Sequence, residues 1–155
     1  MSGISWKDFI LELDPRAELG EPVPDERIVQ AEKALGGALP EELREFLLEV
    51  GTVTWEAMLA ELWSIEDIEE QNVQFRTYED FKELYMPFDH LLFFGADGCG
   101  DMYCYAIDGD RVIRRNDIFM WDHETDARNH ETYGLRRFLT EQVKQYRAIE
   151  KMEEE

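Results

Sequence analysis

The spacing of apolar residues changes near residue 90, and this change constrains the fold more than any other feature of the sequence. Before it, the segment LPEELREFLLEVG (39–51) places apolar residues at i, i+3, i+4 and i+7, the spacing of one buried helix face. After it come four short apolar or aromatic segments separated by turn residues, namely HLLFFGA, DMYCYAI, RVIRR and DIFMWD. Asp108-Gly109 predicts a tight hairpin between the second and the third of them. Helices followed by a run of strands predict an α+β domain with a largely antiparallel sheet.

Further helices are predicted on both sides of the strands. The segment 23–37 has a proline in its first turn and ends at two glycines, and the segment 134–150 carries a continuous apolar face. Helical spacing also extends over residues 55–62, and TYEDFKELYMP (77–87) is typical of a helix that ends before its proline. The last residues, 151–155, are expected to fray.

The length and composition are those of one domain, assigned to residues 1–155. With 155 residues, of which 44% are hydrophobic, the chain has enough apolar side chains for a single packed core. No apolar stretch approaches the roughly 20 residues of a membrane span, and the first residues lack the basic start and the apolar core of a signal peptide. We therefore expect a cytoplasmic protein that does not enter a membrane.

Acidic residues greatly outnumber basic ones. The chain has 36 Asp and Glu against 16 Lys and Arg, a net charge of −20, and residues 51–110 contain 14 of the acids but only 2 of the bases. Nucleic acids and anionic lipids bind through cationic groups, so this balance argues against both as partners. A basic protein would instead be attracted over a Debye length of about 8 to 10 Å. Solubility alone would also account for the acidity.

The segment FFGADGCGDMYCY (93–105) places three glycines, Gly95, Gly98 and Gly100, between two apolar runs. Their spacing superficially matches a dinucleotide-binding loop, but such a loop opens a helix, whereas a strand pattern follows here. No Lys or Arg occurs between residues 83 and 110 to bind a phosphate, and the EF-hand spacing for calcium is absent. The glycines are therefore interpreted as structural turn residues, which allow a positive φ and a close crossing of the chain.

The sequence contains no recognisable catalytic or metal-binding motif. In WDHETD (121–126), His123 lies beside acids, but neither H-x-x-x-H nor H-E-x-x-H occurs, and a hydrogen-bonded turn residue is the more common role. Cys99 has no basic neighbour in sequence to activate its thiol. We expect neither an enzyme nor a bound metal or cofactor. A metal-dependent hydrolase that uses Asp101, Asp122 and His123 is the least favoured alternative.

Several motifs follow one another in a specific order. They are VPDERIVQAEKALGGALPEELREFLLEVG, LWSIEDI, LLFFGADGCGDMYCYAIDGD, IFMWDHETD and a terminal LRRFL helix. Their order and spacing resemble the SUKH superfamily, in its branch related to the fungal cell-wall synthesis regulators, over residues 23–143. One departure is Val50-Gly51-Thr52, where members commonly have an Asn-Gly-Gly turn.

The resemblance implies an α+β fold in which a mixed, mainly antiparallel sheet is flanked by helices. For bacterial members it also implies an immunity function, in which an intracellular protein binds and neutralises a polymorphic toxin, often a nuclease. The acids Asp97, Asp101, Asp122 and Glu124, in the glycine-rich turn and at the strand ends, are the predicted contacts for a basic toxin, and Asp101 and Asp122 are equally explained as turn residues. The alternative is a regulatory scaffold or adaptor that binds endogenous proteins, as the fungal relatives suggest.

Overall fold

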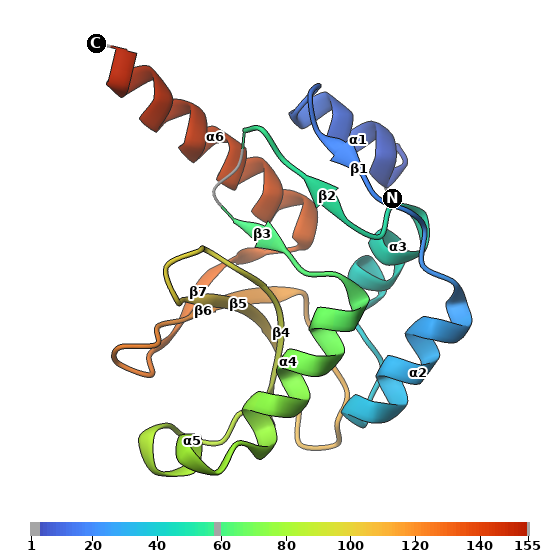
Figure 1. Ribbon diagram of the computed structural model, residues 1–155, viewed down its shortest axis with the longest axis vertical. Coiled ribbons are helices and arrows are strands. Elements are labelled where there is room, and N and C mark those ends of the chain that lie inside the picture. The colour runs from blue at the N-terminus through green and yellow to red at the C-terminus, as the bar shows by residue number, and fades with distance from the viewer. Residues whose placement is uncertain (1–3, 58–59, 155) are drawn as a thin grey trace.

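The computed structural model describes residues 4–57 and 60–154, and these residues form six helices and seven strands (Figure 1). In chain order, the elements are α1 (Trp6–Leu13), β1 (Glu18–Leu19), α2 (Asp25–Leu35), α3 (Glu41–Glu49), β2 (Val53–Thr54), β3 (Glu61–Leu62), α4 (Ile65–Thr77), α5 (Glu79–Leu84), β4 (Leu91–Ala96), β5 (Met102–Ala106), β6 (Asp117–Trp121), β7 (Arg128–Tyr133) and α6 (Leu135–Glu154). The helices predicted at 23–37, 39–51 and 134–150 correspond to α2, α3 and α6.

The strands form two antiparallel sheets. β3, β4, β5, β6 and β7 lie side by side in that order, and β1 pairs with β2 in a separate sheet. The α+β fold class is confirmed. Every pairing among the described residues is antiparallel, so the parallel pairing that a mixed sheet would contain does not occur there.

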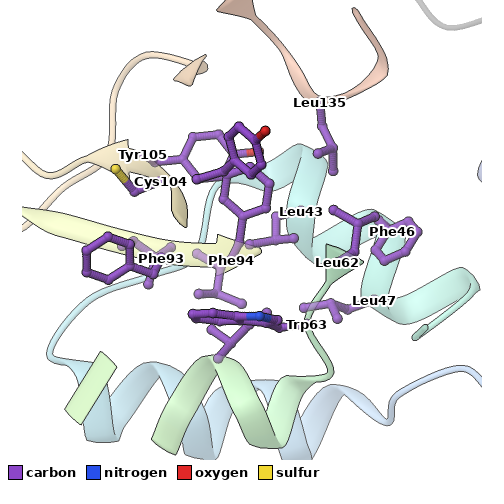
Figure 2. Close-up of a cluster of buried hydrophobic side chains, with 14 of the residues drawn as sticks. Leu43, Phe46, Leu47, Leu62, Trp63, Phe93, Phe94, Cys104, Tyr105 and Leu135 are labelled. Carbon is purple, nitrogen blue, oxygen red and sulfur yellow. The ribbon is translucent and has the colours of Figure 1, made fainter. Parts of the chain in front are cut away.

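Helices cover both faces of the five-stranded sheet. On one face, Phe93 of β4 packs against Phe75 of α4, with ring centroids 5.3 Å apart. On the other face, Phe94 packs against Phe138 of α6, with ring centroids 5.9 Å apart. Phe93 and Phe94 point in opposite directions because neighbouring residues of a strand alternate between its faces. Both are fully buried, so β4 runs through the middle of the core, part of which Figure 2 shows.

The side chain of Asn72, on α4, continues the edge of the sheet beside β4. β3 pairs with the end of β4, and the N–H of Trp63 then donates to the carbonyl of Phe94. Beyond that point, Asn72 Oδ1 accepts from the N–H of Phe93 at 2.8 Å, and Asn72 Nδ2 donates to the Phe93 carbonyl at 2.8 Å. Asn72 is 1% exposed, so its amide satisfies the N–H and the carbonyl of Phe93 where solvent does not reach them.

A second polar group, the partly buried Glu42 of α3, joins three elements. Its Oε2 accepts from the hydroxyl of Tyr105 in β5 at 2.7 Å and from the N–H of Leu135, the first residue of α6, at 2.9 Å. A helix start leaves this N–H without an intrahelical partner, so Glu42 caps α6. Burial raises the pKa of Glu42, and the hydrogen bonds from Tyr105 and Leu135 offset only part of this effect.

The strand predicted for RVIRR (111–115) is wrong. The N–H of Arg111 donates to the carbonyl of Asp108 at 2.9 Å, which forms a turn at the predicted place, but the chain then runs without a regular element to β6. The last strand of the meander is instead β7. The sequence did not suggest β7 because its residues are mostly polar and only Thr132 is buried.

Other differences concern the ends of elements. The helix predicted over 55–62 is not formed by residues 55–57 or 60–62, which lead from β2 into β3. Met58 and Leu59 of that prediction lie outside the described residues. α6 continues to Glu154, through most of the tail that was expected to fray. Among the helices that the structure describes, none is both long and apolar enough to span a bilayer.

Replacing Asn72 tests the buried amide. Asn72→Leu leaves the N–H and the carbonyl of Phe93 unpaired in the core, so we expect the free energy of unfolding to fall by about 2–5 kcal/mol. Asn129→Leu, at an exposed position of β7, is the matched control, with an expected change within about 0.5 kcal/mol. Urea unfolding followed by tryptophan fluorescence measures both. Equal losses in the two variants would contradict the bridging role of Asn72.

Glu42 makes stability depend on pH. Because its pKa is raised in the folded protein, its contribution is fully present below the usual value of 4.5 and is lost as the pH rises through the raised value. Glu42→Gln keeps an acceptor for both hydrogen bonds and cannot ionise. The stability of the native protein relative to Glu42→Gln should therefore fall as the pH rises from about 4 to about 7. Urea unfolding of both proteins across this range measures the difference, and a difference that moves the other way would contradict the assignment.

Candidate functional site

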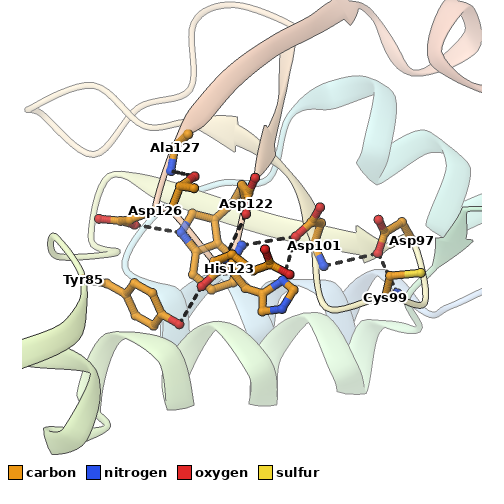
Figure 3. A network of polar contacts seen from close by, with 11 residues as sticks. Tyr85, Asp97, Cys99, Asp101, Asp122, His123, Asp126 and Ala127 are labelled. Atoms are coloured by element: carbon orange, nitrogen blue, oxygen red, sulfur yellow. Dashed lines mark hydrogen bonds and ion pairs between the residues drawn. The ribbon is translucent and has the colours of Figure 1, made fainter.

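Two turns lie together at one end of the five-stranded sheet (Figure 3). Residues 97–101 join β4 to β5, and residues 122–127 join β6 to β7. In an antiparallel meander every second connection falls at the same end of the sheet, which is why these two turns meet. They contain all four acids predicted as partner contacts, namely Asp97, Asp101, Asp122 and Glu124.

Asp97 holds the first turn in shape. Its N–H donates to the carbonyl of Asp101 at 3.1 Å, which closes the hairpin. Its Oδ1 accepts from the N–H groups of Cys99 at 2.8 Å and Asp101 at 3.2 Å. Gly98 and Gly100 have φ values of 86° and 105°, in the region that residues with a side chain seldom adopt. One carboxylate and two glycines thus fix the path of this turn.

The three glycines predicted as turn residues lie in different surroundings. Gly98 and Gly100 lie in the turn, whereas Gly95 lies inside β4, where a Cβ would come within 2.5 Å of the Glu61 carbonyl oxygen on β3. A Cβ on Gly100 would meet Cε1 of His123 at 2.7 Å, while a Cβ on Gly98 would meet nothing within 4 Å. Gly95 therefore permits the close approach of β3, and Gly100 permits the contact between the two turns.

Asp101 and His123 join the two turns. Asp101 Oδ1 lies 2.7 Å from His123 Nδ1 and also accepts from the His123 N–H at 3.2 Å. The hydrogen bond to Asp101 raises the pKa of His123, and the charges of Asp101, Glu124 and Asp122 act in the same direction. The same hydrogen bond lowers the pKa of Asp101. Both shifts have the same cause, because the hydrogen bond between the imidazole and the carboxylate stabilises the charged form of each group.

Asp126, an acid of WDHETD that was not predicted as a partner contact, holds the second turn. Its carboxylate accepts from Trp121 Nε1 at 2.8 Å, Arg128 Nη2 at 3.0 Å and the N–H of Met86 at 2.9 Å. Burial by itself would raise the pKa of Asp126, but the hydrogen bonds from Met86, Trp121 and Arg128 together lower it. Nothing in the sequence marks this role, because Asp126 takes a positive φ of 62° without being glycine and contacts Met86, 40 residues away.

The three partly buried acids each use one carboxylate oxygen to hold a turn. Asp97 Oδ1 and Asp101 Oδ1 make the bonds described above, and Asp122 Oδ1 accepts from the N–H of Glu124 at 2.8 Å. Within the described part of the chain, their Oδ2 atoms have no hydrogen bond, and none of the four acids forms an ion pair with Lys or Arg. Glu124 itself is exposed. Asp97, Asp101 and Asp122 thus present carboxylate oxygens in fixed positions.

Two groups near this end of the sheet bear on possible catalysis or metal binding. Burial raises the pKa of the Cys104 thiol to about 12, which keeps it protonated. One ligand atom from each of Asp101, Asp122 and His123 lies within 4.8 Å of the others, a grouping that could hold a metal ion. Asp101, however, already bonds to His123, and Asp122 accepts from the N–H of Glu124, so the turn structure accounts for their positions.

Gly98 and Gly100 form a matched pair for testing the contact between the turns. Both have a positive φ, so alanine should cost about 1 kcal/mol at either position, but only Gly100→Ala also displaces the His123 ring. We expect Gly100→Ala to be the less stable variant and to bring the NMR-titrated pKa of His123 back toward 6.5. Gly98→Ala should leave the His123 pKa raised. The same His123 pKa in both variants would contradict the described contact.

Comparison with known proteins assigns the chain to a family. Residues 25–139 match the family described as SMI1-KNR4 cell-wall, SUKH_6, and the matched region includes both turns. The search of curated proteins found no match. Members of the SUKH family are typically immunity or regulatory proteins. Because the match covers well over half of the chain, this protein belongs to the SMI1-KNR4 family of the SUKH superfamily.

Proposed function

We propose that this protein is a cytoplasmic immunity protein that binds a cognate basic toxin and neutralises it through the acidic surface formed by the two turns. Family membership supports this proposal, because the SMI1-KNR4 family includes toxin-immunity proteins. A nuclease toxin fits the charge of the surface, since a nuclease must present cations to bind nucleic acid.

The observation that carries the proposal is the set of free carboxylate oxygens at the turns. Asp97, Asp101 and Asp122 hold the turns through Oδ1 and keep Oδ2 without a hydrogen bond among the described residues. A Lys or Arg of the toxin can therefore bind these oxygens without first displacing a Lys or Arg of the same chain. Because the hydrogen bonds of the turns already fix the backbone, binding costs little conformational entropy.

Charge also acts before contact. A net charge of −20 attracts a basic protein and raises its association rate, and this attraction weakens as salt shortens the Debye length. Once bound, the acidic surface covers the cationic surface that the toxin uses for its substrate. Neutralisation then follows from occlusion and needs no chemical step in the immunity protein.

Isosteric charge removal at the turns tests the proposal. Asp97→Asn and Asp122→Asn each keep an Oδ1 acceptor for the turn, so the double variant should keep its melting temperature. We expect it to associate about tenfold more slowly at low salt with the toxin domain encoded beside this protein, because two charges facing the toxin are lost. Surface plasmon resonance at low and high salt measures the rates.

The double variant Glu153→Gln, Glu154→Gln is the matched control. It removes two charges from the far end of α6, away from both turns (Figure 1), and should associate almost as fast as the native protein. If both double variants slowed association equally, the net charge of the protein would account for the attraction, and the turns would have no specific part in it. No capture of the toxin domain at either salt concentration would contradict the immunity function and favour a regulatory scaffold.

A further inference from the structure

An aromatic pocket opens beside the turns, between α4, α5 and the segment that follows α5. Its volume is about 320 Å³, and its walls include the rings of Phe75, Phe81, Tyr85 and Phe88. We call it the α5 pocket. Phe88 is buried, whereas the other three rings are only partly buried and leave aromatic surface facing the pocket.

Exposed apolar side chains lie in the same segment. Met86, which lines the pocket, is 64% exposed, and Leu84 at the end of α5 is 67% exposed. Helix α5 buries none of its residues. Burial in the core therefore does not account for these apolar side chains, and apolar surface gathered around a concave site is typical of a protein interface.

Hydrogen bonds fasten the α5 pocket to the second turn. Tyr85 Oη donates to the His123 carbonyl at 3.0 Å, as Figure 3 shows. The N–H of Met86 donates to Asp126 at 2.9 Å, and Arg128 Nη2 donates to the Met86 carbonyl at 2.9 Å. The pocket and the acidic turns are therefore parts of one continuous surface with a fixed relative position.

The charges around the α5 pocket favour a basic occupant. The two cations of its lining are engaged within the chain: Arg76 donates to the carbonyls of Leu35 and Leu91, and Lys82 Nζ lies 3.0 Å from Glu79. The remaining acids of the segment 79–89 form no ion pair among the described residues. They are Asp80, Glu83 and Asp89.

We infer that the α5 pocket receives an apolar side chain from the same basic partner protein that the acidic turns contact. This inference rests on the proposed function and adds the partner's chemistry: an apolar residue surrounded by Lys and Arg. Interfaces commonly place one buried apolar anchor in a pocket and surround it with a polar rim. Here the aromatic walls receive the anchor, and the carboxylates of the turns and of α5 form the rim.

Two lysine-rich synthetic peptides test the pocket without knowledge of the toxin. One carries a single central phenylalanine, and the other has serine in its place. We expect both peptides to shift the amide NMR signals of the two turns, and only the phenylalanine peptide to shift those of Phe81 and Lys82. Met86→Ser should weaken binding of the phenylalanine peptide by at least about fivefold, because it removes an exposed apolar side chain from the wall of the pocket.

Met152→Ser is the matched control, because Met152 is 73% exposed at the far end of α6. Both serine variants should unfold at the same urea concentration as the native protein. Equal binding of the two peptides, with shifts at the turns alone, would overturn the pocket and leave the electrostatic function standing. No binding by either peptide would overturn both. Self-association of the protein that Met86→Ser abolishes would assign the pocket to a second copy and also overturn the inference.

Discussion

The rest of the structure depends on one interaction, in which the Asn72 side-chain amide pairs with the backbone N–H and carbonyl of Phe93. β3 is only two residues long, so it leaves part of the β4 edge without a strand partner. Asn72 of α4 supplies the missing hydrogen bonds at this edge, and this fixes the position and the rotation of α4 relative to the sheet. Once α4 is fixed, Phe75 lies against Phe93 and Trp121, with ring centroids 5.3 Å and 5.8 Å away. The segment after α4 is then held close enough for Met86 to reach Asp126.

The part of the fold that could be predicted is the part in which one residue type repeats with a clear period. α2, α3 and α6 each bury one face, and β4 to β6 are short and strongly apolar. β7 escaped prediction because it is an edge strand with a single buried residue, so its pairing with β6 leaves no apolar pattern. RVIRR has the composition of a strand, but Arg111 donates to the carbonyls of Asp89 and Leu35 and so ties the segment to the end of α2.

The candidate site shows the same limit. The sequence placed acids and glycines at the turns, because strand ends are where such residues gather. It could not show that Asp101 reaches His123, 22 residues away, or that Asp126 reaches back to Met86. Nor could it separate Gly95, which a neighbouring strand requires, from Gly100, which a neighbouring ring requires. These distinctions depend on which strands become neighbours, and that follows from packing of the whole sheet.

Asp97, Asp101 and Asp122 each hold a turn with one carboxylate oxygen and leave the other without a hydrogen bond among the described residues, which affects how this surface can change in evolution. One oxygen maintains the loop, so the loop keeps its shape while residues outside this bonding change. Glu124 is exposed, and among the described residues its carboxylate makes no hydrogen bond. Under the proposed function, substitution of Glu124 would change the surface offered to a toxin while leaving the hydrogen bonds of the turn intact. If the protein neutralises toxins as proposed, a lineage facing a succession of altered toxins can exchange the outer residues of one scaffold, and its core need not evolve in step.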